Sequence, residues 1–276
     1  MATRHRRRNV CRRVTPRPKL RGAAGAANTD GCDVRLDRAF TLIELLVVVA
    51  IVVLLIGLLL PALAIARRSA RVIGCASNLQ QLGVGMALYL NDYSNTLPQD
   101  GSGIAARFGG RSGWLPEPDM TPGADVRPLN RYVSAKPLHE DDDVFLFRCP
   151  LDRGLNSPLL PIDLMYEAIG TSYNLNDHDL TGEDAWTLIP LNGGRMPYVA
   201  DPSKTWVLAD VPVYNYQDGY NLYQYWHHPD RVEVNMLMLD GHVEGSVVMT
   251  EDRALWTSRY TFWPVPDWDE LRSRMP

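Results

Sequence analysis

Residues 38–68 read RAFTLIELLVVVAIVVLLIGLLLPALAIARR. Within residues 40–66, only Thr41 and Glu44 carry polar side chains. At about 1.5 Å per residue, a helix of this length exceeds the roughly 30 Å hydrocarbon core of a bilayer. A secretory signal peptide is the competing interpretation, but its apolar region is only about 7–15 residues long. The run therefore predicts a membrane-spanning helix.

Glu44 is the one residue of this run that a simple membrane anchor does not explain. A charged side chain in a membrane helix costs about 2.5–3.5 kcal/mol at the bilayer centre, and less near the interface. In apolar surroundings a carboxylate is favoured only where a cation offsets its lost hydration. Intramembrane carboxylates are also rare and usually functional. We therefore expect Glu44 to have a cationic partner.

The segment from Ala39 to Val47, AFTLIELLV, resembles the cleavage and methylation site of type IV pilins and type II secretion pseudopilins. The resemblance implies that a prepilin peptidase cuts between Ala39 and Phe40, and that the new N-terminal amine is methylated. It also implies that Glu44 pairs with the amine of Phe40 on a neighbouring subunit. Pro61 matches a helix-loosening proline that many family members share. Ala39 is a departure, because the family usually has Gly before the cut.

This resemblance also implies a function and its partners. The chain would be a structural subunit without enzymatic activity, assembled into a filament of a type II secretion or type IV pilus-like machine. Its partners would be prepilin peptidase, other pilin-like subunits and the lipid of the inner (cytoplasmic) membrane, with no nucleic acid. A single pass would leave the N-terminus in the cytoplasm and the globular domain outside it. The alternative is a membrane-anchored extracytoplasmic module that binds a metal, a polysaccharide or an envelope protein and does not polymerise.

The charge distribution agrees with this topology. The 276-residue chain has a formal net charge of -4, but residues 1–39 hold 11 Lys or Arg and three Asp, so the remainder carries -12. A basic leader before an apolar span follows the positive-inside rule, despite Arg67, Arg68 and Arg71 on the far side. A basic arm that binds nucleic acid is the less favoured interpretation of residues 4–21, because cleavage would remove it.

We divide the chain into four parts. They are a basic leader that processing removes (1–39), a transmembrane and assembly helix (40–66), an amphipathic extension of that helix (67–95) and an extracytoplasmic globular α+β domain (96–276). Because this leader is unusually long, a second hypothesis is that translation starts at Val34 instead of Met1. Apolar side chains at steps of three or four define the extension: Val72, Ala76, Leu79, Leu82, Met86, Tyr89 and Tyr93.

Pro61 should allow a bend or local melting of this helix, because proline removes one backbone hydrogen bond.

Beyond the helix, the pilin-like arrangement predicts a small antiparallel β-sheet packed on the helix's C-terminal half. Candidate strands are residues 144–150 and 204–210, and a hairpin of 232–239 with 242–248. Asp240-Gly241 between the last two suits a two-residue type I′ turn. Residues 99–142 are expected to be an irregular connection with a short helix at 129–133.

A second resemblance extends along the chain. Five segments resemble planctomycete-type pseudopilin-like proteins, a group marked by a histidine, nine residues and Asp-Gly: Asn78–Gly83, Tyr89–Tyr93, Phe147–Pro150, Thr171–Asn174 and Leu239–Val243. This chain departs from the group's spacing, because eleven residues separate His228 from Asp240.

Cys75 and Cys149 are the two cysteines outside the leader. Outside the cytoplasm such a pair can oxidise, and closing so long a loop would contribute up to about 4 kcal/mol. Two unpaired buried thiols are the alternative.

Residues 177–184 resemble the start of a calcium loop, with Gly182 at its sixth position. The oxygen ligands would be Asp177, Asp179, Thr181 and Glu183. Leu188 stands where such a loop needs a bidentate acid, but the related pseudopilins often hold Ca²⁺. A solvated polar loop is the alternative.

A second metal site is suggested by side chains around the predicted hairpin: His227, His228, Asp230 and His242. Imidazole and carboxylate suit Zn²⁺, yet this spacing matches no established zinc pattern. Hydrogen-bonded polar groups are the alternative. No esterase elbow, phosphate-binding loop, zinc-protease or Cys-x-x-Cys motif occurs in the sequence, so no motif supports enzymatic activity.

Overall fold

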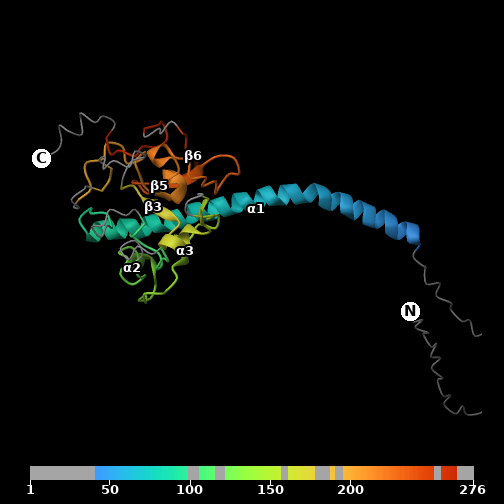
Figure 1. The fold of residues 1–276 in the computed structure, drawn as a ribbon, viewed down its shortest axis with the longest axis horizontal. Coiled ribbons are helices and arrows are strands. Elements are labelled where there is room, and N and C mark those ends of the chain that lie inside the picture. The colour runs from blue at the N-terminus through green and yellow to red at the C-terminus, as the bar shows by residue number, and fades with distance from the viewer. Residues whose placement is uncertain are drawn as a thin grey trace, which may run out of the picture. The chain divides into compact units, whose positions relative to one another are not determined.

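The computed structural model describes residues 41–98, 106–115, 122–156, 161–177, 187–189, 195–251 and 256–265. The chain divides into two compact units, residues 1–53 and 54–276, and helix α1 (Leu42–Asp92) contributes to both (Figure 1). The second unit also contains short helices and strands. These are α2 (Asn130–Val133), η1 (Phe145–Phe147), β1 (Leu155–Asn156), β2 (Pro161–Ile162), α3 (Met165–Ile169), β3 (Tyr173–Leu175), β4 (Trp206–Asp210), η2 (Val211–Tyr214), η3 (Gln217–Gly219), β5 (Glu233–Met238) and β6 (Val243–Val248).

Helix α1 is 51 residues long and confirms the long helix predicted from the apolar run and its amphipathic extension. Its buried side is spaced by three or four residues, as a helical face requires, and consists of Cys75, Leu79, Leu82, Gly85, Met86 and Tyr89. The helix is continuous through Pro61, so the local melting predicted there is not observed.

The end of α1 also lies where the sequence predicts it. Asn95 donates its backbone N–H to the Leu90 carbonyl at 2.8 Å. Ser94 and Asn95 have positive φ angles of 54° and 62°. Asn is one of the few residues that accept the left-handed conformation that ends a helix. Tyr93, expected on the buried face, lies beyond the helix and is 40% exposed.

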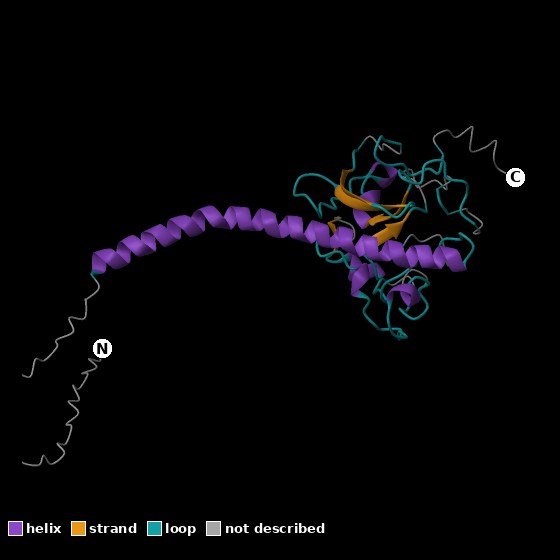
Figure 2. Ribbon diagram, turned by 180° about the vertical axis from the view of Figure 1, so that it is seen from behind, coloured by secondary structure: helices purple, strands orange, loops and turns teal. Residues whose placement is uncertain are grey.

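A four-stranded antiparallel sheet forms the centre of the second unit, in the order β3-β4-β5-β6. Figures 1 and 2 show this sheet on one side of the C-terminal half of α1, with α2 and α3 on the other. The α+β pilin-like arrangement predicted from the sequence is therefore observed. The strand predicted at 204–210 and both strands of the predicted hairpin are also confirmed.

Every residue of β4 and of β5 is buried, because the sheet separates two apolar clusters. On the α1 side, Leu208 and Leu237 pack with Leu79 and Leu82. Gly83 allows this contact, since a Cβ there would lie 2.8 Å from a Leu237 methyl carbon. The opposite face packs against the C-terminal segment in a second cluster that includes Trp206, Val234, Met236, Tyr260 and Phe262.

Two local predictions are wrong. The strand expected at 144–150 is instead the 3₁₀ helix η1, closed by local bonds from the Phe147 N–H to Val144 and from the Arg148 N–H to Phe145. A strand needs a neighbouring strand to accept its hydrogen bonds. Here the turn buries Phe147 fully, while Phe145 is 63% exposed.

The hairpin turn also differs from the predicted two-residue type I′ turn. Met238 and His242 are joined by a backbone bond of 2.8 Å across a three-residue loop. Gly241 has a φ of 94°, whereas Asp240 has no positive φ. A type I′ turn would require positive φ at both residues. The Asp240 carboxylate instead accepts the His242 backbone N–H at 3.1 Å.

The described parts of residues 99–142 are ordered around a buried arginine. Arg127 is 2% exposed. Its guanidinium donates to the carbonyl oxygens of Ala106, Gly109 and Ile169 at 2.7–2.8 Å. Asn130, the first residue of α2, bonds both backbone groups of Gly110. The described parts of this region therefore form the predicted irregular connection, which packs around Arg127, and the helix predicted at 129–133 is confirmed as α2.

Candidate functional site

The N-terminus of α1 carries a reciprocal pair of hydrogen bonds between Thr41 and Glu44. The Thr41 backbone N–H and hydroxyl both donate to Glu44 Oε2 at 2.9 Å, and the Glu44 N–H donates to Thr41 Oγ1 at 3.2 Å. This arrangement is a capping box, which satisfies backbone donors that the first turn of a helix leaves unpaired.

The capping box gives Glu44 a partner that the sequence interpretation overlooked. We expected only a cation on another molecule, although the Thr-x-x-Glu pattern that predicts the box is present at residues 41–44. Within the part of the chain that the structure describes, Oε1 of Glu44 accepts no hydrogen bond. The residues of the predicted cut, Ala39 and Phe40, lie outside the described residues.

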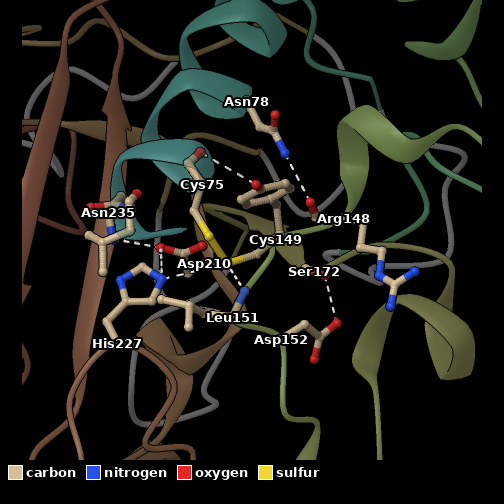
Figure 3. Close-up of a disulfide and its surroundings, with 12 residues drawn as sticks. Cys75, Asn78, Arg148, Cys149, Leu151, Asp152, Ser172, Asp210, His227 and Asn235 are labelled. Carbon is tan, nitrogen blue, oxygen red and sulfur yellow. Dashed lines mark hydrogen bonds and ion pairs between the residues drawn. A yellow bond between two sulfur atoms is a disulfide. The ribbon is translucent and has the colours of Figure 1, made fainter. Parts of the chain in front are cut away.

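A second polar cluster lies inside the domain, around the disulfide that joins Cys75 of α1 to Cys149 (Figure 3). Both cysteines are at most 1% exposed. His227 Nε2 lies 3.5 Å from Cys149 Sγ and 3.5 Å from Asp210 Oδ2. The same carboxylate oxygen accepts the Asn235 backbone N–H at 2.6 Å. The cluster therefore connects α1, β4, β5 and the segment before β5.

The comparison with protein families falls on the first of these two sites. Residues 34–60 match the family model described as the prokaryotic N-terminal methylation motif. The chain carries a type IV pilin-like signature. The matched range includes the predicted cut, Glu44 and most of the apolar run. A search of the curated proteins finds no significant match, and neither does a search of the solved structures.

The methylation motif lies on a helix that is suited to membrane anchoring. By length and composition, α1 contains a stretch that can cross a membrane, with a mean hydropathy of 3.3 and none of it buried. The motif and this stretch together support a pilin-type precursor held in a membrane. The finer resemblance to planctomycete-type proteins stays a prediction.

The predicted calcium ligands are only partly described. Asp177 accepts the Tyr214 hydroxyl at 3.3 Å. Asp179, Thr181 and Glu183 lie outside the described residues, so the calcium loop stays a prediction.

The expected zinc ligands are not gathered into one site. His227 faces Asp210 and the disulfide, whereas His242 bonds Asp240 at 2.6 Å. His228 accepts the Asp230 backbone N–H at 3.2 Å. Among the described residues, the group of four closest to a metal-site geometry is Cys75, Cys149, Asp210 and His227, whose ligand atoms lie within 4.8 Å of one another. The disulfide uses both sulfurs, so this oxidised form offers a metal two side chains instead of the usual four.

Asp210 is the titratable group that this cluster perturbs most clearly. Burial raises its pKa from the ordinary 3.8 to about 6, against the opposing effects of His227 and the Asn235 amide. The folded protein therefore binds this proton at a higher pH than the unfolded chain does. The resulting contribution to stability is fully present below pH ~4 and is lost as the pH rises through about 6.

We expect this group to lower the free energy of unfolding by about 3 kcal/mol between those limits. Asp210→Asn does not titrate, and its side-chain oxygen can still accept the Asn235 N–H, so the variant should lose this part of the pH dependence. Urea unfolding of the full chain in detergent at pH 4 to 7 measures the effect. Asp230→Asn changes an exposed carboxylate and serves as the control. Equal pH profiles for Asp210→Asn and the wild type would contradict the prediction.

Proposed function

We propose that this chain is the precursor of a pilin-like structural subunit, cut between Ala39 and Phe40, methylated at Phe40 and assembled through α1 into a filament. The observation that carries the proposal is the methylation motif at residues 34–60, which continues directly into an exposed apolar helix. The machine would be a type II secretion system or a type IV pilus-like assembly, and the partners would be prepilin peptidase, sister subunits and inner-membrane lipid.

The geometry at Glu44 supports a specific role in assembly. Cleavage converts Phe40 into the residue that carries the α-amino group, whose ordinary pKa of about 7.7–8.0 leaves it largely protonated at neutral pH. Oε2 of Glu44 serves the capping box, whereas Oε1 accepts nothing from the described residues. One carboxylate can therefore cap its own helix and accept the Phe40 amine of a neighbour.

Lateral packing would come from the apolar part of α1. Its side chains from Leu42 to Leu60 include many that are more than half exposed. A helix that is apolar all round is stable only in lipid or against other apolar helices. In a filament, neighbouring copies of the same helix would provide that surface.

N-terminal sequencing combined with mass analysis tests the proposal on membrane-extracted protein. The expected mature chain begins at Phe40 and carries one added methyl group. In cells without prepilin peptidase, the leader should remain. Ala39→Gly introduces the family's usual residue and should be cut at the same bond at least as completely. A wild-type chain that keeps residues before Phe40 when the peptidase is present would contradict the proposal.

A further inference from the structure

A groove of about 830 Å³ lies in the second unit, between residues 64–73 of α1 and the segment 227–233. Positive charge predominates in its lining, which contains five arginines and one carboxylate. The arginines are Arg67, Arg68, Arg71, Arg153 and Arg231, and the carboxylate is Glu233.

Most of these arginines are not neutralised by the protein. Arg231 pairs with Glu233 at 2.8 Å. Across the described ranges of the chain, no ion pair is formed by Arg67, Arg68, Arg71 or Arg153. The chain after residue 39 has a net charge of -12, so a local excess of cations runs against its overall balance. Cations that line one groove raise the local concentration of an anionic ligand.

The position of the groove in the sequence indicates which anion it meets. The apolar run ends at Ala66, and the first groove arginine is the next residue. A helix that leaves the hydrocarbon core places its following residues at the level of the lipid headgroups. Two exposed apolar side chains, Ile65 and Ile73, also line the groove and are 69% and 68% exposed. A ligand with a phosphate and an acyl chain matches both kinds of lining.

We propose that this groove binds the headgroup of an anionic phospholipid at the membrane surface from which α1 emerges. Guanidinium groups suit the phosphate, because their paired N–H donors match two phosphate oxygens. The lipid also explains three arginines immediately after a membrane span, on the side where the positive-inside rule disfavours them. The inference rests on the membrane insertion contained in the proposed function.

The experiment uses the full chain in nanodiscs with equal amounts of phosphatidylglycerol and phosphatidylcholine. Native mass spectrometry then measures which lipid stays bound after release from the disc. Wild type should retain phosphatidylglycerol selectively. Arg67→Gln and Arg71→Gln should each reduce that preference about fivefold, as expected for a cation near an anionic surface. Glu233→Gln removes the only carboxylate that lines the groove and should therefore increase the preference for phosphatidylglycerol.

The matched control removes two cations elsewhere, with Lys136→Gln and Lys204→Gln, whose ammonium groups pair with Asp142 and Asp201. This control should keep the wild-type lipid preference. An equal loss in the control and in the groove variants would overturn the proposal, because net charge alone would then explain it. Displacement of the lipid by millimolar inorganic phosphate would overturn it as well, since it would indicate a site for free anions.

Two further outcomes separate this inference from others. If wild type shows no lipid preference but forms a dimer in phosphatidylcholine discs that the Arg67→Gln variant disrupts, the occupant is a second copy and the lipid proposal is wrong. A chain correctly cut at Phe40 that shows no lipid preference contradicts this inference alone. A chain that fails to enter the discs contradicts the membrane insertion on which both proposals depend.

Discussion

Glu44→Gln chains are expected to enter the membrane and to be cut, but to assemble poorly. Glutamine also closes a capping box, so the start of α1 should stay intact while the negative charge is lost. Removing one member of an ion pair in apolar surroundings typically costs about 3–5 kcal/mol. The assembly equilibrium constant should therefore fall by about two to four orders of magnitude.

Thr41→Ala is the complementary variant. It removes the hydroxyl that caps the Glu44 N–H and leaves the carboxylate in place. Losing an N-cap costs about 0.5–2 kcal/mol of helix stability, but the pairing charge remains, so filaments should still form. Assembly of both variants is measured by chemical cross-linking in membranes, followed by determination of the size of the cross-linked oligomers. N-terminal sequencing must first show equal cutting.

The two variants distinguish the two roles of Glu44. Poor assembly of Glu44→Gln with near-normal assembly of Thr41→Ala supports the carboxylate as an intersubunit partner. If Glu44→Gln assembles as wild type does, capping is sufficient to explain this residue. If only Thr41→Ala fails, the start of the helix is the critical feature and the charge is incidental.

Removal of the Cys75–Cys149 disulfide is expected to lower the free energy of unfolding by about 4 kcal/mol. The bond closes a loop with a sequence separation of 74 residues, and the chain-entropy relation gives this magnitude for such a loop. Both cysteines are buried, and the bond joins α1 directly to the segment after η1. Its loss should therefore loosen the attachment of the helix to the domain.

Urea unfolding of the double variant Cys75→Ala/Cys149→Ala, in detergent, measures this contribution. Wild type treated with a dithiol reductant should show a lower midpoint, whereas the double variant should not respond to the reductant. The control in the uncut precursor is Cys11→Ser/Cys32→Ser, which changes the other two cysteines of the chain. Equal midpoints for wild type and the Cys75→Ala/Cys149→Ala variant would show that the disulfide does not stabilise the domain.

Features with a local signal were accessible from the sequence. The apolar run and the three-and-four spacing of Leu79, Leu82 and Met86 predict α1, because a helix repeats every 3.6 residues. Two strand candidates on either side of Asp240-Gly241 predict the hairpin of β5 and β6. The capping box at residues 41–44 also had a local signal, although our interpretation of Glu44 did not use it.

Other features depend on partners far along the chain. The segment 144–150 has the composition of a strand, yet no strand among the described residues pairs with it, and η1 forms instead. Arg127 is buried because two separate segments, residues 106–109 and the end of α3, offer it three carbonyl oxygens. The sequence around residue 127 does not indicate which carbonyl groups will accept these hydrogen bonds. The partners of a buried polar group are set by the tertiary structure.

The sequence by itself determined the long helix, its apolar half and the methylation motif, because each depends on residues within a few turns of one another. Only the tertiary structure decided that Cys75, Cys149, Asp210 and His227 meet, and that the arginines of α1 share a groove with the segment before β5. These groups are far apart along the chain, and packing of the sheet against α1 brings them together.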